Sequence, residues 1–227
     1  MKGDRGAPSR RVAPSNPSEV THAMRPRGES LPTLLAEVRR CRACVPHLPL
    51  GPRPVLQIGA AARILVVGQA PGARVHATGI PRDDASGDRL RAWLGVDERT
   101  FYDESTIAIL PVGLCYPGRG ASGDLPPRSE CAVLWFDRLL ARLPDVELTF
   151  AVGAHAQRQV LRARRKATLT DTVRAWREYA PRVFPLPHPS PRNQPWLARH
   201  AWFERELVPE LRARVRRIAR PGKEAGR

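Results

Sequence analysis

The stretch Ile64-Leu65-Val66-Val67-Gly68-Gln69-Ala70-Pro71-Gly72 decides the fold, because a short apolar run passes at once into a stiff loop. Such a run, bounded by turn residues, is typical of a strand buried on both faces of a parallel sheet. A weaker apolar run at 183–186 leads in the same way into His188-Pro189-Ser190-Pro191-Arg192-Asn193. In an open α/β sheet, the loops at the carboxyl ends of the strands form the ligand crevice. We therefore expect the two loops to line one pocket.

The rest of the chain alternates between strand and helix patterns. Two more strands are predicted, at 107–112 and 148–152, and this alternation implies right-handed crossovers and a parallel sheet covered on both faces. Helices are predicted from the stripe of apolar residues that each segment carries, with Ser30 and Ser86 as caps, Gly95 as a stop and a kink at Pro209. The residues expected to be buried in helices are Leu31, Leu34, Leu35, Val38, Leu90, Trp93, Leu94, Val133, Leu134, Phe136 (or Trp135), Leu139, Leu140, Phe203, Leu207, Leu211 and Val215, and two further helices are expected at about 154–164 and 171–179.

Length and charge indicate one basic domain. The 227 residues suit a single body at 30–215, between a disordered basic tail (1–29) and a basic C-terminal tail (216–227). No apolar run approaches the ~20 residues of a membrane span, and the N-terminus lacks an apolar signal-peptide centre, so a cytoplasmic protein is expected. Association with the nucleoid and a monomeric state are further expectations. The formal charge is +16, of which the two tails carry +3 and +4 and the body +9. A basic body favours a nucleic-acid partner, although an arginine-rich composition is the alternative explanation.

The four cysteines form a tight pair, Cys41 and Cys44, and two more separated members, Cys115 and Cys131. Four free buried thiols are the simplest interpretation, and disulfides are disfavoured in a chain that looks intracellular. The pair alone is typical of either a redox or a zinc site. One site with four thiolate ligands is favoured for all four together, and both zinc and a [4Fe-4S] cluster use such ligation.

Taken in order, these motifs resemble those of the iron–sulfur (family 4-like) branch of the uracil-DNA glycosylase superfamily. The resemblance covers roughly 34–215 and rests on Cys41-Arg42-Ala43-Cys44, Ile64 to Gly72, Gly79-Ile80-Pro81, Ser86-Gly87, Cys115-Tyr116-Pro117-Gly118, Cys131 and His188-Pro189-Ser190-Pro191. It implies a three-layer α/β/α sandwich with a four-stranded, mostly parallel sheet. It further implies an enzyme that flips deoxyuridine out of DNA and hydrolyses its N-glycosidic bond in base excision repair. The four cysteines would then hold a structural [4Fe-4S] cluster, with zinc as the less favoured occupant.

The resemblance also implies roles for single residues. His188, as a neutral imidazole, would donate to the base oxygen as the base becomes anionic. Ser190 and Arg192 would contact DNA phosphates, or Arg192 would wedge into the base stack. For the attacking water the family pattern implies an acid in or near the first loop, and Gln69 is the residue that we expect to hold the water here. The remaining residues expected to line the substrate and DNA site are Gly68, Ala70, Pro71, Gly72, Arg82 and Pro111.

Three positions depart from the family pattern. The first loop carries no acid, so the water would be held by Gln69, with help from His76, Asp83 or Asp84. Arg82 stands where the family usually has a phenylalanine that stacks on the base. Pro111 stands where an asparagine usually reads the uracil edge.

These departures keep two alternatives open: excision of another deaminated base, or a catalytically weak protein that binds damaged DNA. A nucleotide-binding enzyme is disfavoured, because no Gly-rich phosphate-binding motif opens a helix.

Overall fold

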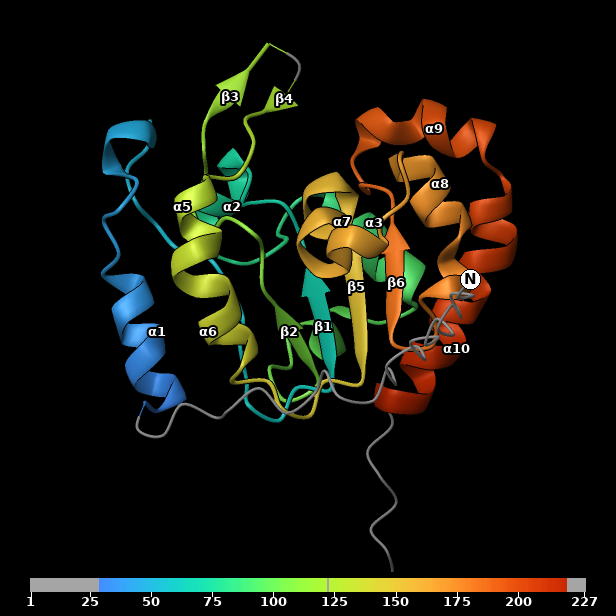
Figure 1. Ribbon diagram of the computed structural model, residues 1–227, viewed down its shortest axis with the longest axis horizontal. Coiled ribbons are helices and arrows are strands. Elements are labelled where there is room, and N and C mark those ends of the chain that lie inside the picture. The colour runs from blue at the N-terminus through green and yellow to red at the C-terminus, as the bar shows by residue number, and fades with distance from the viewer. Residues whose placement is uncertain (1–28, 122, 220–227) are drawn as a thin grey trace, which may run out of the picture.

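A four-stranded parallel sheet forms the centre of the protein in the computed structural model, which describes residues 29–121 and 123–219. The strands are β1 (Ile64–Val67), β2 (Ile107–Ile109), β5 (Leu148–Val152) and β6 (Val183–Leu186), in the order β2-β1-β5-β6. Helices cover both faces (Figure 1), so the three-layer α/β/α prediction is confirmed. The strand that follows β1 in the chain, β2, lies on one side of β1, and β5 lies on its other side. This reversal between β1 and β5 is where open α/β sheets bind ligands, at the carboxyl ends of the strands.

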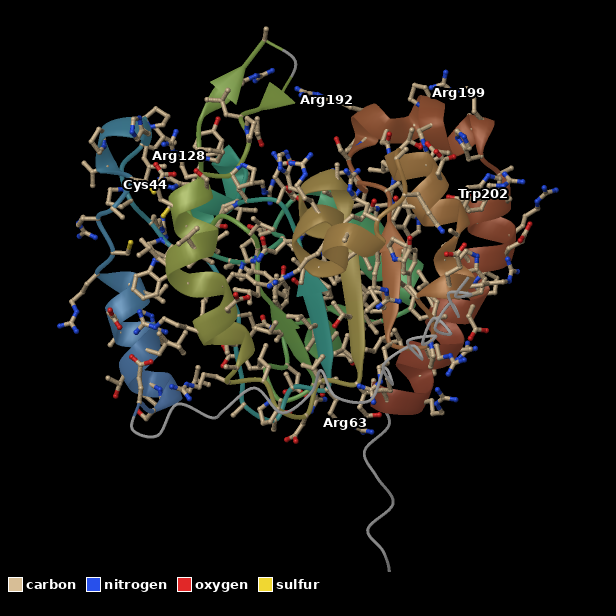
Figure 2. All side chains as sticks on the ribbon, in the orientation of Figure 1. Cys44, Arg63, Arg128, Arg192, Arg199 and Trp202 are labelled. Atoms are coloured by element: carbon tan, nitrogen blue, oxygen red, sulfur yellow. The ribbon has the colours of Figure 1, made fainter. Side chains whose placement is uncertain are left out.

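Alternate side chains of each strand point to opposite faces of the sheet, so the hydrophobic core has two halves, one on each face. In β1, Ile64 and Val66 face one helical layer while Leu65 and Val67 face the other, and all four are at most 2% exposed. This pattern follows from the period of two in a strand that is covered on both sides. Side chains fill the space between the sheet and each layer (Figure 2). The sheet is therefore a rigid base for the loops that leave its carboxyl edge.

The first layer contains α3 (Ala85–Leu94), α4 (Glu98–Phe101), α8 (Leu169–Arg174), α9 (Gln194–Arg199) and α10 (Val208–Ala219). The second layer contains α1 (Leu31–Arg39), α5 (Ser129–Cys131), α6 (Asp137–Leu140) and α7 (Gly153–Leu161). The short helix α2 (Ala73–Thr78) and the hairpin of β3 (Arg119–Gly120) and β4 (Gly123–Asp124) stand at the carboxyl edge of the sheet. None of the helices among the described residues is long and apolar enough to cross a membrane.

Most of the expected elements are confirmed, including strands 64–67, 148–152 and 183–186, the Ser30 cap and the Gly95 stop. β2 ends three residues earlier than predicted. Beyond Ile109 the chain still contacts the first loop, since the Val112 N–H donates to the Gly68 carbonyl at 2.9 Å, but Pro111 has no N–H to continue a ladder. The predicted Ser86 cap is wrong. Asp84 caps α3 instead, with its carboxylate accepting from the Gly87 N–H at 2.8 Å.

Two wide π-helical turns also change the expected burial. Ala132–Phe136 form one such turn between α5 and α6, and Val133, Leu134 and Leu140 are 85%, 41% and 37% exposed rather than buried. A π turn contains one more residue than an α-helical turn, which changes the side chains that face the core. In this segment the buried side chains are Trp135, Phe136 and Leu139. The second π turn, Phe203–Leu207, directly precedes α10 at the position where Pro209 predicts a kink.

The domain boundaries at both ends need correction. Helix α10 continues to Ala219, and Ile218 is buried, so the C-terminal tail does not begin at residue 216. Glu29 is ion-paired to Arg142 at 3.4 Å and belongs to the folded body rather than to the N-terminal tail. The other residues of the expected N-terminal tail, 1–28, and those at 220–227 lie outside the described residues.

Candidate active site

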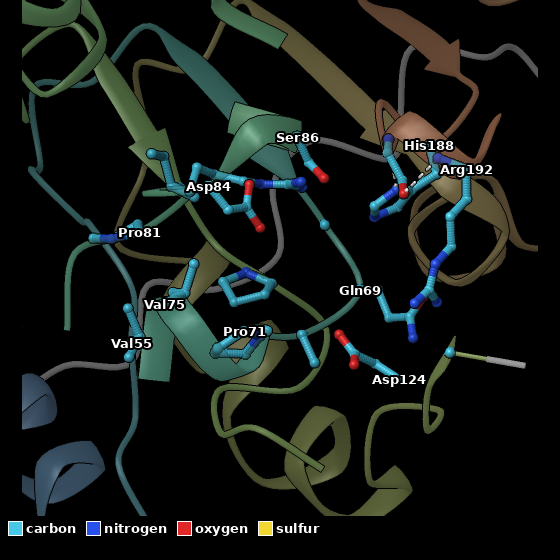
Figure 3. A pocket seen from close by; sticks show the side chains of 18 residues that line it. Val55, Gln69, Pro71, Val75, Pro81, Asp84, Ser86, Asp124, His188 and Arg192 are labelled. Carbon is cyan, nitrogen blue, oxygen red and sulfur yellow. Dashed lines mark hydrogen bonds between the residues drawn. The ribbon is translucent and has the colours of Figure 1, made fainter. Parts of the chain in front are cut away.

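A pocket of about 420 Å³ opens at the carboxyl edge of the sheet (Figure 3). Four separate segments build it: the loop after β1, the segment between α2 and α3, the hairpin and the loop after β6. All ten residues expected to act in catalysis or in substrate and DNA binding line this pocket, namely Gly68, Gln69, Ala70, Pro71, Gly72, Arg82, Pro111, His188, Ser190 and Arg192. The two loops chosen from the sequence therefore meet at one cavity, as expected. Their individual roles remain predictions.

The His188 ring is held in one orientation. Its Nδ1 accepts the backbone N–H of Ser190 at 3.2 Å, and its carbonyl accepts the Asn193 side chain at 3.0 Å. The ring also packs on Gly153, where a Cβ would lie 3.4 Å from the His188 Cδ2. Burial, reinforced by the Arg82 charge, lowers the pKa of His188 to about 4. At neutral pH the imidazole is therefore neutral, and its single proton is on Nε2, because Nδ1 is an acceptor.

Arg82 is a partly buried cation in this pocket. Its guanidinium lies on Gly68, so that a Cβ at Gly68 would be only 2.1 Å from Nη2. Burial lowers the pKa of Arg82, and the nearby Asp84 opposes that shift. The backbone of Arg82 is left-handed (φ 60°), which is unusual for a residue other than glycine. Arg82 thus contributes N–H donors and a positive charge, not an apolar wall, beside His188.

Two carboxylates flank Gly72 within the pocket, one from Asp84 and one from Asp124. The Oδ2 atoms of Asp84 and Asp124 lie 3.9 and 3.5 Å from the position of a Cβ on Gly72. Asp84 was among the acids that the sequence offered, whereas Asp83 pairs with Arg74 at 3.4 Å and does not line the pocket. Asp124 was missed, because it lies on the hairpin more than fifty residues from the first loop, and no local pattern links the two.

The hairpin that carries Asp124 is tied to both pocket loops. The Gln69 amide donates to the Leu125 carbonyl at 3.1 Å, which leaves the Gln69 Oε1 free to accept. Gly123, with φ 145°, lies against Arg192, whose Nη1 is 3.0 Å from where a Cβ would be. The hairpin therefore closes one side of the pocket. Its direct contact with Arg192 explains why a glycine stands at position 123.

His76 does not join the pocket. It lies in α2 with 9% of its surface exposed, and its ring is 6.2 Å from that of Tyr116. The sequence offered no helix at 73–78, because Ala73-Arg74-Val75-His76 shows too little apolar period. His76 is thus a packing residue in this structure and not a candidate to hold the water.

The four cysteines also meet, at a second and smaller cavity. Cys41, Cys44, Cys115 and Cys131 line it together with Arg128, Leu134 and Trp135, among others, and all four thiols are free. Burial raises the pKa of Cys115 to about 11 and that of Cys131 to about 12. The Leu114 N–H donates to the Cys131 Sγ at 3.2 Å, and the Trp135 Nε1–H donates to the Cys41 Sγ at 3.3 Å. N–H donors directed at sulfur favour thiolates, so this donor set suits four-thiolate ligation.

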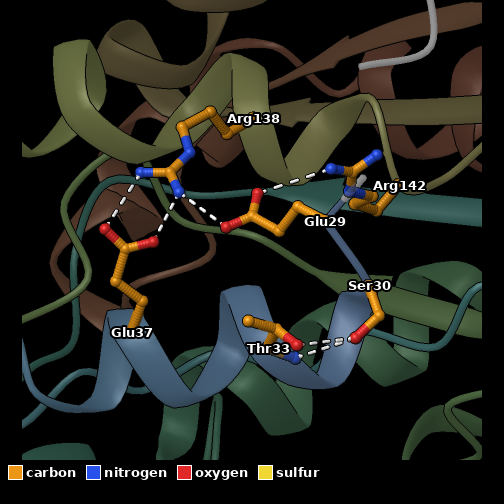
Figure 4. Close-up of polar contacts among 6 residues, drawn as sticks. All are labelled: Glu29, Ser30, Thr33, Glu37, Arg138 and Arg142. Carbon is orange, nitrogen blue, oxygen red and sulfur yellow. Dashed lines mark hydrogen bonds and ion pairs between the residues drawn. The ribbon is translucent and has the colours of Figure 1, made fainter. Parts of the chain in front are cut away.

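Ion pairs hold the helix before Cys41 against the helix after Cys131 (Figure 4). Arg138 of α6 contacts Glu37 of α1 at 2.5 Å and Glu29 at 2.9 Å, and Arg142 contacts Glu29 at 3.4 Å. Exposed pairs each contribute about 0–1 kcal/mol, so this network orients the helices more than it stabilises the fold. The two cysteine-bearing segments are therefore joined by these ion pairs at the surface and by apolar packing below it.

A compact metal-binding group is not present in the described part of the chain, 29–121 and 123–219. No three His, Cys, Asp or Glu side chains there are arranged to hold a metal ion. A single tetrahedral zinc needs sulfurs that converge on one centre at about 2.3 Å. A four-iron cluster instead spreads its four ligands over different iron atoms.

One comparison with known proteins bears on this site. Residues 56–212 match the family model of the uracil DNA glycosylase superfamily. The matched range includes the sheet, both pocket loops and the hairpin. Cys41 and Cys44 lie before it, so the match itself does not extend to the whole cysteine cavity.

Proposed function

The chain belongs to the uracil DNA glycosylase superfamily, and we propose that it excises uracil from DNA by hydrolysing the N-glycosidic bond, as a first step of base excision repair. The observation that carries the proposal is the state of His188 in the pocket. A neutral imidazole whose single proton is on Nε2 can donate one hydrogen bond from that atom and carries no charge. Membership of the superfamily supports DNA glycosylase activity, and uracil as the base is our further proposal.

The reaction needs a donor where charge develops. When the bond between C1′ and the base nitrogen breaks, its electron pair leaves with the base, whose oxygen becomes anionic. A preorganised donor in a site of low polarity stabilises such an anion far more than it does in water. His188 provides that donor, and the Ser190 N–H and Gly153 hold its ring in place. Because its pKa is lowered, His188 stays a neutral donor across the physiological range.

Binding of the flipped nucleotide uses the pocket rim. Extruding a base costs a few kcal/mol of stacking and pairing, which contacts to the DNA backbone offset. Ser190 and the exposed Arg192 stand on the loop after β6, and Arg89 supports that loop with a bond to the Ser190 carbonyl at 3.3 Å. We propose phosphate contacts for Ser190 and Arg192. Gln69 presents its free Oε1 to the attacking water.

The cysteine cavity is proposed to hold a structural [4Fe-4S] cluster, with zinc as the alternative occupant. Cys41, Cys44, Cys115 and Cys131 would be its ligands, and a bound cation would deprotonate thiols whose pKa burial has raised. Such a cluster would brace the segments that carry it and take no part in the reaction. A brown protein with about four iron atoms per chain is the expected result. A colourless protein with one zinc would contradict it.

A specific observation favours a second candidate, excision of another deaminated base. Pro111 presents no side-chain amide to read the edge of uracil, and the Arg82 guanidinium stands in the pocket with donors only. An arginine fork matches two adjacent acceptors such as O6 and N7 of a purine. Hypoxanthine, the deamination product of adenine, presents those two acceptors.

A gel assay on labelled oligonucleotides tests both candidates. Alkali-labile breaks at U·G, U·A or single-stranded uracil, abolished by His188→Ala and kept by the control His155→Gln outside the pocket, would support uracil excision. Breaks only at hypoxanthine would support the second candidate. Binding without breaks at any base would refute the enzyme and leave a protein that only binds damaged DNA.

A further inference from the structure

Asp124 is an acidic side chain in a pocket that the proposed function assigns to DNA. The chain as a whole carries a formal charge of +16, and a carboxylate in the pocket repels the phosphates of a bound strand. Asp124 nevertheless lines the pocket, with its Oδ2 3.5 Å from the Cβ position of Gly72, and its carboxylate points from the hairpin toward the first loop (Figure 3). An acid in this position weakens DNA binding in general, unless a hydrogen-bond donor of the ligand meets it.

Both carboxylate oxygens of Asp124 are available to such a donor. In the part of the chain that the structure describes, the Asp124 side chain has no hydrogen bond and no ion pair. The other carboxylate of the pocket, that of Asp84, differs in this respect, because its Oδ1 accepts the N–H that begins α3 at 2.8 Å. Burial lowers the pKa of Arg82, and the Asp84 charge opposes that shift. Asp84 is thus engaged with the helix and with Arg82, whereas Asp124 keeps its full capacity to accept hydrogen bonds.

Arg82 supplies the complementary chemistry in the same pocket. Its guanidinium carries N–H donors only, and it lies on Gly68, at the opposite end of the first loop from Gly72. A planar base that lies along this loop therefore meets donors at one end and carboxylates at the other. Arg82 suits a carbonyl oxygen of the base, and Asp124 suits a ring N–H beside that carbonyl.

This pair of side chains distinguishes a deaminated base from its parent. Deamination replaces an amino group by a carbonyl oxygen. The adjacent ring nitrogen, an acceptor in cytosine and adenine, then carries a proton and is a donor in uracil and hypoxanthine. In the parent bases the amino group would face the Arg82 donors and the ring nitrogen would face the Asp124 carboxylate, so both contacts would be repulsive. A site whose polar groups are left unpaired by an analogue rejects that analogue strongly.

We propose that Asp124 is a specificity-determining residue that accepts the ring N–H of the flipped base, next to the carbonyl that Arg82 binds, an inference that rests on the proposed glycosylase function. The hairpin then reads the edge of the base in place of the side-chain amide that Pro111 does not provide. The class of base selected in this way has a carbonyl beside a ring N–H, which covers both uracil and hypoxanthine. Thymine and guanine share these groups, so Asp124 selects against cytosine and adenine only.

A ratio of two dissociation constants tests the proposal, because general repulsion of DNA by a carboxylate cancels in such a ratio. The first pair of probes is DNA with one 2′-fluoro-2′-deoxyuridine or one 2′-fluoro-2′-deoxycytidine, and the second pair carries the inosine or the adenosine counterpart. Fluorine at C2′ disfavours the cation-like sugar, so the base stays attached. Each probe base stands opposite an abasic site, so that neither has a pairing partner to leave. Asp145→Ala is the matched control for Asp124→Ala, since Asp145 is also an exposed acid, precedes β5 at the opposite edge of the sheet and does not line this pocket.

We expect the wild type to bind the deaminated member more tightly in the pair that matches its substrate. Asp124→Ala should lower this preference by about 10-fold or more, the effect of a lost hydrogen bond to a charged group. Asp124→Asn is the second variant. Its amide can turn either the oxygen or the nitrogen toward the base, so it should lose the preference chiefly by binding the cytidine or adenosine probe more tightly. Asp145→Ala should keep the wild-type ratio.

Three results would overturn the proposal. The first is an unchanged ratio in Asp124→Ala, whether the two affinities rise together, as for general repulsion of DNA, or fall together, as for a hairpin that has lost its shape. The second is a loss of preference in Asp84→Asn with none in Asp124→Ala, which would assign the reading of the base to the start of α3. The third is a wild type without any preference. A wild type that prefers the deaminated probe but releases no base would instead refute the glycosylase and leave Asp124 as the selective residue of a protein that binds damaged DNA.

Discussion

Protonation of His188 should destabilise the protein at acidic pH. The pKa falls from 6.5 to about 4 on folding, because the ring is buried next to the Arg82 charge. Each pH unit of such a difference corresponds to about 1.4 kcal/mol, so the whole shift corresponds to about 3 kcal/mol. The unfolded chain takes up a proton near pH 6.5 and the folded chain only near pH 4. The free energy of unfolding therefore loses about 3 kcal/mol from this site between pH 6.5 and pH 4, and nothing above pH 6.5.

Removing the imidazole isolates this contribution. In His188→Gln no group titrates at the site, so the difference in unfolding free energy between wild type and variant should change by about 3 kcal/mol between pH 7 and pH 4. Urea unfolding at several pH values measures it, with His47→Gln on the surface as the control variant. Histidine ring signals in NMR, assigned through the His188→Gln spectrum, give the pKa directly.

The reasoning fails if the His188 ring titrates near 6.5, or if wild type and His188→Gln lose stability in parallel between pH 7 and pH 4. Either result would mean that the ring is solvated in the free protein. It would then be charged in part of the physiological range, and its role as a neutral donor would need the DNA to desolvate it. A pKa near 4 in the free protein would instead show that the pocket is already prepared before DNA binds.

Three further predictions concern the rim, the turn and the cysteines. Gly87→Ala should lower the free energy of unfolding by about 1–3 kcal/mol in urea titrations, because its Cβ would lie 1.7 Å from the Arg82 carbonyl oxygen, and an unchanged midpoint would contradict this. Arg192→Ala should reduce the slope of log K against log salt by about 1 in DNA titrations, while Arg63→Ala, at the far end of the sheet (Figure 2), should leave it unchanged; equal slopes for all three proteins would rule out the phosphate contact. Cys131→Ser should lower the iron content measured by metal analysis, and a full complement of iron in this variant would remove Cys131 from the ligand set.

The sheet could be predicted from the sequence because its signal is local. Apolar runs such as 64–67 and 148–152 have few ways to be buried other than as central parallel strands, and the structure places both as expected. The meeting of the first loop with the loop after β6 follows from that topology alone. Every residue of these two loops that was expected in the pocket lines it, at the carboxyl edge of the sheet.

Features that depend on competition between neighbours were predicted less well. Asp84 and Ser86 can each cap a helix, and the choice depends on the left-handed turn at Arg82, which brings the Gly87 N–H to Asp84. The exposure of Val133 depends on a π turn, which the apolar pattern does not reveal. Asp124 could not be assigned to the pocket, because a hairpin of two-residue strands has no hydrophobic period and its placement depends on long-range contacts.

The hairpin connects the two cavities of the protein. It lies between Cys115 and Cys131, and a ligand held by both cysteines would close this loop at its base. Cross-linking a loop of about 15 residues removes roughly 3 kcal/mol of chain entropy from the open state. The same hairpin receives the Gln69 amide at Leu125 and lies against Arg192 at Gly123. A cluster at the cysteines would therefore act on the pocket without touching it, by holding in place the wall against which Gln69 and Arg192 rest. Such a cluster would lie away from the reacting atoms, and the part of the protein that it would stabilise is the hairpin and not the sheet.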